Sequence, residues 1–467
     1  VGFYGSELVT NGGFDTDSNW TKGTGWTIAN GKATQSGGTG QLSQSISIST
    51  GVVCKFTFTV TIQSGTLRIS AGVSAPVQDF TESGTHTFNL AFAGNTVLYF
   101  LGTSSSFSGS IDSISIKEIT GDRARLNYEI EGGLVNTKPS LLLEPQSTNL
   151  ITYSNDFANS YWTKSGTSIS SNAFVSPDGT LNAYKLVEDT SNGSHICFNQ
   201  QTGASKTFSF FAKSSGNQYV AISYDGGANF TFFDILNGQL GTVADSSRTS
   251  KIENYGNGWF RCSMYNGHGT YGATIWMSKD GATVSYQGDG SSGVYIYGAQ
   301  LEQLSYPTSY IPTNGSTQTR AAETCNGAGT SSILPSEEGI LYAEIASLTT
   351  EGAGATRLSI NDGSQDNNVT IGYSASNTVR IIIRSSSSNQ ALITSTQTIT
   401  DFLKIAVKYK ANDFALYING SLIGTDTSGS APSGMNDVSF DKGDGTLDWY
   451  GKIRDIRVYN TKEMTDS

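Results

Sequence analysis

The sequence predicts an all-β protein built from tandem β-sandwich or jelly-roll domains. Apolar and polar residues alternate with a period of two in several segments, such as residues 54–62, and this alternation is the pattern of a half-buried strand. Turn signals rich in Gly, Asn and Asp separate these segments, and no stretch shows the period of an amphipathic helix of three turns. The 22 Tyr, 22 Phe and 54 Gly residues agree with strands joined by tight turns.

A motif near the N-terminus occurs twice in the chain. Each copy contains a Leu, a Phe and a Trp-Thr-Lys triplet in that order: Leu8, Phe14 and Trp20-Thr21-Lys22, then Leu150, Phe157 and Trp162-Thr163-Lys164. The Leu and the Trp recur at the same offset of 142 positions (150 − 8 and 162 − 20). Such a repeat marks the start of a folding unit that is used twice. We expect both Trp side chains to be packed as part of the scaffold.

Three apolar segments have the character of closing strands: 110–116, 293–302 and 451–459. The last strand of a jelly roll often pairs near the first, which makes it central and apolar. A chain of 467 residues is also long enough for roughly three domains. The expected parts are the domains 1–120, 149–313 and 314–467 and a connector, 121–148. X-Pro pairs in the connector favour extended backbone.

Charge and hydropathy exclude two classes of partner. The net charge is −11, and no cluster of Lys or Arg offers the basic face that a nucleic acid requires. No apolar run approaches the ~20 residues of a membrane-spanning helix. We therefore expect neither nucleic-acid binding nor membrane insertion.

The sequence offers little for catalysis or for cysteine chemistry. His86, His195 and His268 lie among small polar or apolar residues, and the chain lacks the motifs of serine hydrolases, zinc proteases and phosphate-binding loops. We expect no enzyme, although the many carboxylates leave a glycosidase-type pair open. The cysteines lack zinc-ligand spacing, and Cys197 and Cys262 either pair or remain buried thiols.

Distinctive segments follow one another in the middle domain and its lead-in: 139–150, which precedes the domain, is followed by 207–213, 233–238, 256–263, 297–302 and 308–313. The second reads Thr-Phe-Ser-Phe-Phe-Ala-Lys, and the fourth reads Gly-Asn-Gly-Trp-Phe-Arg-Cys-Ser. In this order they resemble a module of bacteriophage tail-fibre and virion structural proteins, over roughly residues 123–320. The resemblance implies a place on the virion surface and other virion proteins as partners.

The two outer domains carry resemblances of their own. Asn-Gly-Gly-Phe at 11–14 and Ile-Asp-Ser-Ile-Ser-Ile at 111–116 resemble the start and end of carbohydrate-binding jelly rolls in extracellular glycan-active proteins. The segments 404–409, 414–420 and 452–459 resemble, in the same order, strands of the concanavalin A/laminin-G-like sandwich. The last domain is therefore expected to be concanavalin A-like, and it lacks the Glu-x-Asp-x-x-Glu strand of sandwich-fold glucanases.

A calcium site is one of two interpretations of the first loop. Asp15 and Asp17 provide alternating oxygen ligands, as at the start of an EF-hand loop, but Trp20 stands where that loop needs Gly. Asp and Asn also simply form turns. The jelly-roll resemblance implies a structural calcium near the first and last strands, held with Asn11 and Asp112. We expect no cofactor other than this structural calcium.

Glycan binding needs exposed aromatic rings that can stack on sugar rings. Trp26 follows a turn and Trp449 and Tyr450 follow an acidic loop, which favours their exposure. Trp276 lies in an apolar segment that fits either a core or a surface position. We expect these four residues to contact glycan, whereas Trp259 is expected in the core.

The combined interpretation is a non-enzymatic phage virion protein, a tail or head fibre, that binds host cell-surface polysaccharide. Several shallow sites would act together through avidity in a homo-oligomer, and fibres are commonly trimers. One alternative is the binding portion of a secreted bacterial glycan-processing protein or adhesin. Another is a purely architectural capsid-decoration or tail protein.

Overall fold

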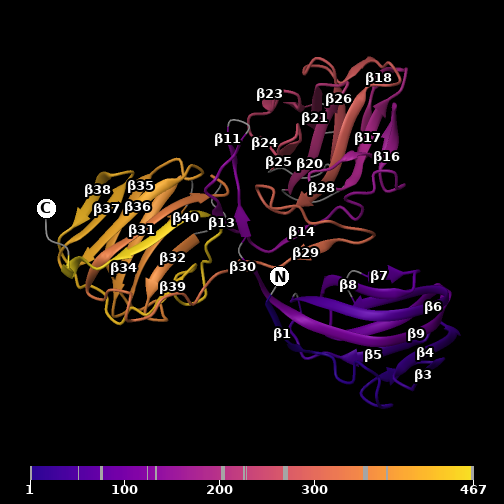
Figure 1. The fold of residues 1–467 in the computed structure, drawn as a ribbon, viewed down its shortest axis with the longest axis horizontal. Coiled ribbons are helices and arrows are strands. Elements are labelled where there is room, and N and C mark those ends of the chain that lie inside the picture. The colour runs from indigo at the N-terminus through magenta and orange to yellow at the C-terminus, as the bar shows by residue number, and fades with distance from the viewer. Residues whose placement is uncertain are drawn as a thin grey trace. The chain divides into compact units, whose positions relative to one another are not determined.

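The computed structural model forms two compact units. One unit comprises Val1–Asp122 with Gln146–Ala321, and the other comprises Arg123–Pro145 with Ala322–Ser467. Strands and one short 3-10 helix, but no α-helix, make up the regular structure of the described residues (Figure 1), so the all-β prediction is confirmed. No helix in the described ranges is long and apolar enough to span a membrane. The structure describes residues 3–50, 52–73, 77–123, 125–131, 134–200, 206–223, 227, 229–266, 272–350, 356–374 and 377–463.

The N-terminal part of the first unit is a β-sandwich. Its strands are β1 (Phe3–Glu7), β2 (Thr21–Lys22), β3 (Trp26–Ala29), β4 (Lys32–Gly38), β5 (Gln41–Ser45), β6 (Val53–Ala71), β7 (Val77–Phe80), β8 (Gly84–Ala91) and β9 (Val97–Arg123). Along β6, Phe56 and Phe58 face the core, as the period of two predicts. Thr57 and Thr59 face the other side, where their hydroxyls lie 3.2 and 2.9 Å from threonine hydroxyls of β8. The alternation therefore sets which face of this strand is buried.

The second sandwich of the first unit has two six-stranded sheets. One is β15 (Thr163–Ser165), β19 (Ile196–Asn199), β26 (Ala273–Ser278), β21 (Tyr219–Ser223), β22 (Phe230–Asp234) and β23 (Gln239–Val243). The other, which we name the β28 sheet, is β16 (Thr167–Val175), β17 (Leu181–Glu188), β28 (Gly293–Glu302), β20 (Lys206–Ser215), β25 (Phe260–Asn266) and β24 (Thr249–Asn254). Two small sheets pair β14 (Ser147–Asn149) with β29 (Gln318–Arg320) and β18 (Asn192–Ser194) with β27 (Ser285–Gln287). The predicted closing segment 293–302 is thus β28, a central strand.

The repeated motif opens both sandwiches of the first unit. Trp20 packs on Phe14 with ring centroids 5.3 Å apart, and Trp162 packs on Phe157 with centroids 5.0 Å apart. Both indoles are buried, so the prediction that they belong to the scaffold is confirmed.

The second unit is a sandwich of a seven-stranded and a five-stranded sheet. The larger sheet is β10 (Arg125–Asn127), β13 (Ser140–Leu143), β40 (Gly451–Tyr459), β31 (Glu338–Ser347), β36 (Leu403–Lys410), β37 (Phe414–Ile418) and β38 (Ser421–Asp426). The smaller, which we name the β33 sheet, is β35 (Ser388–Thr396), β34 (Thr378–Ser385), β33 (Asn368–Ser374), β32 (Thr356–Asn361) and β39 (Asp437–Ser439). The remaining elements are the pair β11 (Ile130–Glu131) and β12 (Leu134–Val135), β30 (Glu323–Thr324) and the 3-10 helix η1 (Thr461–Glu463).

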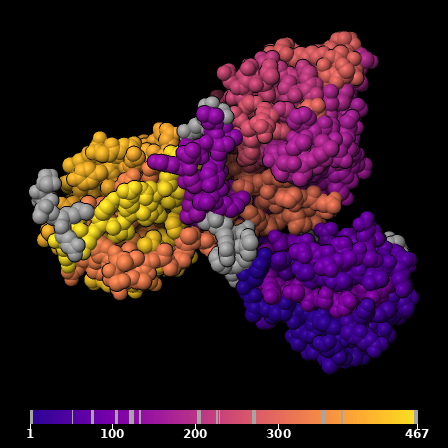
Figure 2. Space-filling view, in the orientation of Figure 1, coloured from indigo at the N-terminus to yellow at the C-terminus, as the bar shows by residue number. Residues whose placement is uncertain are grey.

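Part of the segment predicted as a connector belongs to this sandwich. Leu141 and Leu142 of β13 lie opposite Ile453 and Lys452 of β40. Leu143 is fully buried in the core of the second unit. The apolar Leu run therefore serves as a strand that extends the larger sheet. Figure 2 shows the molecular surface in the orientation of Figure 1.

The four cysteines are free thiols. Cys54, Cys197 and Cys262 are buried, and Cys325 is half-buried. Of the two interpretations of Cys197 and Cys262, the structure shows unpaired thiols within one hydrophobic core.

Candidate functional site

The outer face of the β28 sheet carries a layer of aromatic side chains. Along β28, Val294 and Ile296 point into the core, so the alternate residues Tyr295 and Tyr297 point outward. Phe211 of β20 lies opposite Tyr297 in the strand pairing and shares this outer face. Strands that are far apart in sequence therefore bring aromatic residues together outside the sandwich core.

The inner members of this layer are held rigidly. Phe211, Trp259 and Tyr297 are buried and form a hydrophobic cluster separate from the main core. The Trp259 indole donates to the carbonyl oxygen of Val175 at 3.0 Å, and the Tyr297 hydroxyl donates to Asp178 at 2.8 Å. Burial, helped by the bond to Asp178, raises the pKa of Tyr297 to about 12 and keeps the hydroxyl a donor.

Three rings of the layer reach solvent. Phe174 is 36% exposed and Tyr255 is 43% exposed, while Tyr295 is half-buried. Phe174 stacks on Tyr295 with centroids 4.7 Å apart and planes at 28°, and Tyr255 meets the edge of Phe211 at 4.8 Å. We name Phe174, Tyr255 and Tyr295 the aromatic face. Their neighbours fix the orientation of each ring, so the face needs little ordering when it contacts a ligand.

Charged groups border the aromatic face. The Lys213 ammonium lies 5.2 Å from the centre of the Phe174 ring and donates to the carbonyl oxygen of Asn257 at 2.5 Å. Partial burial would raise the pKa of Asp178, but hydrogen bonds from Thr180 and other neighbours hold it well below its usual value. Lys213 therefore places a cation beside the aromatic face, and Asp178 places an ionised carboxylate at Tyr297 of the inner layer.

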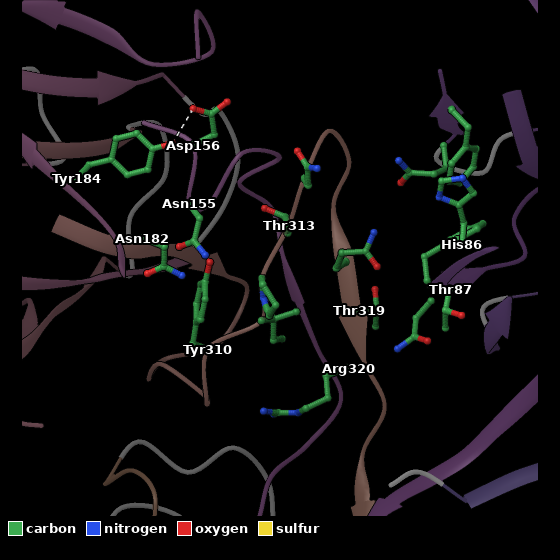
Figure 3. Close-up of a pocket in the computed structure, with 18 of the residues that line it drawn as sticks. His86, Thr87, Asn155, Asp156, Asn182, Tyr184, Tyr310, Thr313, Thr319 and Arg320 are labelled. Carbon is green, nitrogen blue, oxygen red and sulfur yellow. Dashed lines mark hydrogen bonds between the residues drawn. The ribbon is translucent and has the colours of Figure 1, made fainter. Parts of the chain in front are cut away.

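A pocket of about 900 Å³ lies elsewhere in the first unit. Figure 3 shows Asn155, Asn182 and Tyr310 close together on one side of it and His86 on the other. The centre of the Tyr310 ring lies 5.4 Å from that of Tyr297. Tyr310 therefore lines the pocket and also contacts the aromatic layer. Amides, hydroxyls and rings are the groups that this pocket offers to a polar ligand.

Two of the predicted glycan-contacting residues are in the cores. Trp26 is 5% exposed and donates to the carbonyl oxygen of Gly40 at 2.8 Å. Trp449 is fully buried, 5.1 Å from the ring of Tyr373. The expectation that they are exposed is wrong, because the turn before Trp26 and the loop before Trp449 lead directly into core positions. A buried ring cannot stack on a sugar.

The other two predicted aromatics are half-buried and lie apart from the aromatic face. Trp276 belongs to the opposite sheet of the second sandwich and meets Phe230 edge-on at 5.2 Å. Tyr450 lies in the second unit and donates its hydroxyl to Asp448 at 3.1 Å. Glycan contact by Trp276 and Tyr450 stays a prediction.

The predicted calcium ligands have other partners. Asn11 donates its amide to two carbonyl oxygens of the following turn, at 2.7 and 2.9 Å. Asp17 lies 2.5 Å from the Lys22 ammonium, Asp112 lies 3.9 Å from another lysine, and Asp15 is exposed. Within the described ranges, no group of three or more His, Cys, Asp or Glu side chains is placed to hold a metal. Calcium at these four residues stays a prediction.

Both described histidines make packing contacts. The ring nitrogens of buried His195 lie 2.6 Å from the carbonyl oxygen of Gly166 and 3.2 Å from that of Tyr286. His86 packs against two phenylalanine rings of the N-terminal sandwich. His268 lies outside the described residues. These contacts account for His195 and His86 without a catalytic role.

The aromatic face was not predicted from the sequence, because it contains no tryptophan and its three rings come from distant parts of the chain. The closing segment 293–302 does carry a signal in its first half. There, aliphatic residues alternate with tyrosines, so both faces of the strand bear large side chains. A strand with apolar inward residues and aromatic outward residues must cover a core and also present rings on its other face. Phe174 and Tyr255 carry no such local signal.

Comparison with known protein families identifies the fold family of the last sandwich. Residues 346–466 match the family model described as the Concanavalin A-like lectin/glucanases superfamily, Laminin_G_3. The C-terminal sandwich is a concanavalin A-like, laminin G-type domain. No curated protein matches the sequence.

Several solved structures show distant similarity. The tandem CBM22-1-CBM22-2 domains of Paenibacillus barcinonensis Xyn10C are 12% identical, with 64% of this chain and 98% of that chain covered and a TM-score of 0.24. Domains LG4-5 of the mouse laminin alpha1 chain are 9% identical, with 68% and 90% covered and a TM-score of 0.23. A truncated AlyQ with CBM32 and alginate lyase domains is 12% identical, with 98% and 99% covered and a TM-score of 0.18. At such TM-scores these similarities carry no argument about function.

Proposed function

We propose that this protein binds polysaccharide without catalysis, and that the aromatic face of the second sandwich is a binding surface. The observation that carries the proposal is the exposure of Phe174 and Tyr255 on a rigid aromatic layer outside the core. Large exposed apolar rings cost solvation free energy unless a ligand covers them. The flat, apolar sides of sugar rings suit such surfaces, and sugar hydroxyls suit the bordering Lys213 and Asp178.

The finer proposal is a phage tail or head fibre that binds host cell-surface polysaccharide from the virion surface. It rests on the resemblance of the middle domain to virion modules and on the lectin-type family match of residues 346–466. Other virion proteins and further copies of the chain, as in a trimer, are the proposed partners. The same family match supports the alternative of a secreted bacterial glycan-processing protein or adhesin.

An array of bacterial surface polysaccharides tests the binding function with the full chain. The double variant Phe174→Ala/Tyr255→Ala should bind its best polysaccharide about tenfold more weakly, because exposed aromatic anchors dominate such contacts. Tyr417→Ala removes a tyrosine of the second unit that is 37% exposed, and should leave binding unchanged. A wild-type chain that binds no polysaccharide would sink the proposal and favour an architectural role.

The fibre assignment needs separate measurements. The polypeptide should be found in purified phage particles, and light scattering should give the mass of an oligomer. A mass equal to one chain, or absence from particles, would favour the secreted alternative.

A further inference from the structure

The outer face of the β33 sheet gathers three arginines. Arg357 of β32 and Arg380 of β34 both lie opposite Gly372 of β33, so the three residues form one row across the sheet. Residues directly opposite each other in antiparallel strands share a face. Arg384 is four positions after Arg380 on the same strand and therefore points to the same side. We name Arg357, Arg380 and Arg384 the arginine face.

Gly372 creates the space for this arrangement. A Cβ atom at Gly372 would lie 2.7 Å from both Cδ and Nη1 of Arg357. Only a residue without a side chain allows the Arg357 guanidinium to cross the middle strand toward Arg380. The two arginines can therefore lie on either side of Gly372 only because this residue has no side chain.

The arginine face has no internal counter-charge. Across the described ranges, no carboxylate forms an ion pair with any of the three guanidinium groups. Arg357 is 2% exposed, and its Nη1 donates only to the backbone carbonyl oxygens of Thr356 and Tyr373, at 2.9 and 2.8 Å. Burial and the neighbouring Arg380 charge lower the pKa of Arg357 to about 10, so the group still carries its charge at neutral pH.

Two further donors of the face are unused. The Nε atoms of Arg380 and Arg384 are buried and have no hydrogen-bond partner. Both side chains are only half-buried, so their guanidinium groups remain reachable from solvent. The Arg384 guanidinium also donates to the carbonyl oxygen of Ser387 at 2.6 Å, so part of its donor capacity is used inside the fold. These contacts are neutral, and the positive charges of Arg380 and Arg384 therefore remain available to an anion from solvent.

We propose that Arg380 and Arg384 of the arginine face bind the oxyanion group, a carboxylate or a sulfate ester, of an acidic polysaccharide, while buried Arg357 adds positive charge next to Arg380. The proposal rests on polysaccharide binding as the function of this protein and adds a second site that selects charge. Guanidinium groups match carboxylate and sulfate oxygens through paired, charge-assisted hydrogen bonds. Half-exposed Ile382, between Arg380 and Arg384 on the outer side of β34, provides apolar contact for the sugar ring beside its acidic group.

Retention on immobilised heparin, polygalacturonate and dextran tests this site with the full chain. Heparin supplies sulfate, polygalacturonate supplies carboxylate, and dextran carries neither. The wild-type chain should be retained on at least one acidic polymer, more weakly as salt rises. Arg380→Gln/Arg384→Gln should lower that retention about tenfold, as expected when two charge-assisted contacts are lost. Both side chains are half-buried, and circular dichroism checks that the variant folds.

The control is Lys404→Gln, which removes one positive charge from an exposed position on the larger sheet of the same unit. It should leave retention unchanged within about twofold, because long-range attraction of exposed charges is screened by salt. Equal losses in the control and the arginine variant, or no retention of the wild type on either acidic polymer, would overturn the proposal.

The aromatic-face variant separates this proposal from the proposed function. If Phe174→Ala/Tyr255→Ala loses binding on the array but is still retained on acidic polymers, the two sites are separate. The aromatic face then binds the array polysaccharide, and the arginine face binds the acidic polymer. If array binding of neutral polysaccharide persists and acidic polymers are not retained, only the arginine site is refuted.

Discussion

The Trp162 indole donates its Nε1 hydrogen to the carbonyl oxygen of Tyr153 at 2.9 Å, across nine residues of chain. Trp20 makes the equivalent bond to Asn11 at 3.0 Å, also across nine residues. The duplicated motif is therefore one structural device used twice: an indole that closes the opening loop of a sandwich. In the first copy the Asn11 carbonyl oxygen is committed to this bond.

Trp162→Phe should destabilise the second sandwich by about 2–4 kcal/mol. The change removes a buried hydrogen bond, leaves the Tyr153 carbonyl unsatisfied and creates a cavity. Chemical denaturation followed by tyrosine fluorescence measures the loss. Trp276→Phe is the matched control, because the Trp276 Nε1 has no hydrogen-bond partner and the ring is half-buried. Equal losses in both variants would show that the Trp162 bond contributes nothing specific.

An ion pair between buried Glu188 and exposed Lys279 makes the second sandwich sensitive to acid. The Glu188 carboxylate is buried and lies 2.8 Å from the Lys279 ammonium, with further hydrogen bonds from Asn217 and Tyr286. Burial would raise the pKa of Glu188, but these bonds, first that of Lys279, hold it below its usual value. A lowered carboxyl pKa stabilises the fold above the unfolded pKa of about 4.3, and this stabilisation is lost as the pH falls through the folded pKa.

Lys279→Met should therefore lower the free energy of unfolding at neutral pH by about 1 kcal/mol, since Lys279 is 38% exposed and Glu188 keeps its other hydrogen bonds. The difference from wild type should shrink as the pH falls and Glu188 takes up a proton. Urea denaturation at a series of pH values measures both effects. Lys251→Met, which breaks the exposed pair with Glu253, should change little. A Lys279 variant as stable as wild type at neutral pH would contradict the prediction.

Calcium binding by the first loop requires Asp17 to leave Lys22. If Asn11, Asp15, Asp17 and Asp112 do hold calcium, the ion should raise the melting temperature of the wild type relative to chelator, because it binds only the folded state. Asp17→Asn should abolish the shift. Differential scanning calorimetry of the full chain checks this, and an unchanged transition in excess calcium would refute the site.

The sequence by itself determined the strand content and the repeated scaffold. A period of two at 54–62 is sufficient for a half-buried strand, and the two Trp-Thr-Lys triplets are sufficient to locate the two opening loops. The segment 293–302 was also predicted as a closing strand, although its inward residues change phase at a bulge, from Val294 and Ile296 to Ala299 and Leu301. Each of these inferences depends on neighbours along one strand.

Only the tertiary structure decided which aromatic rings are exposed. Trp26 and Trp449 are buried inside their sandwiches. Phe174 and Tyr255, which are far apart in the chain, share one face because Phe174 packs on Tyr295 of β28 and Tyr255 packs on Phe211 of the neighbouring strand β20. The connector's Leu142 likewise gains its place only by pairing with a distant strand. Periodicity tells which residues share a face of a strand, but strand pairing and sheet packing decide which face water can reach.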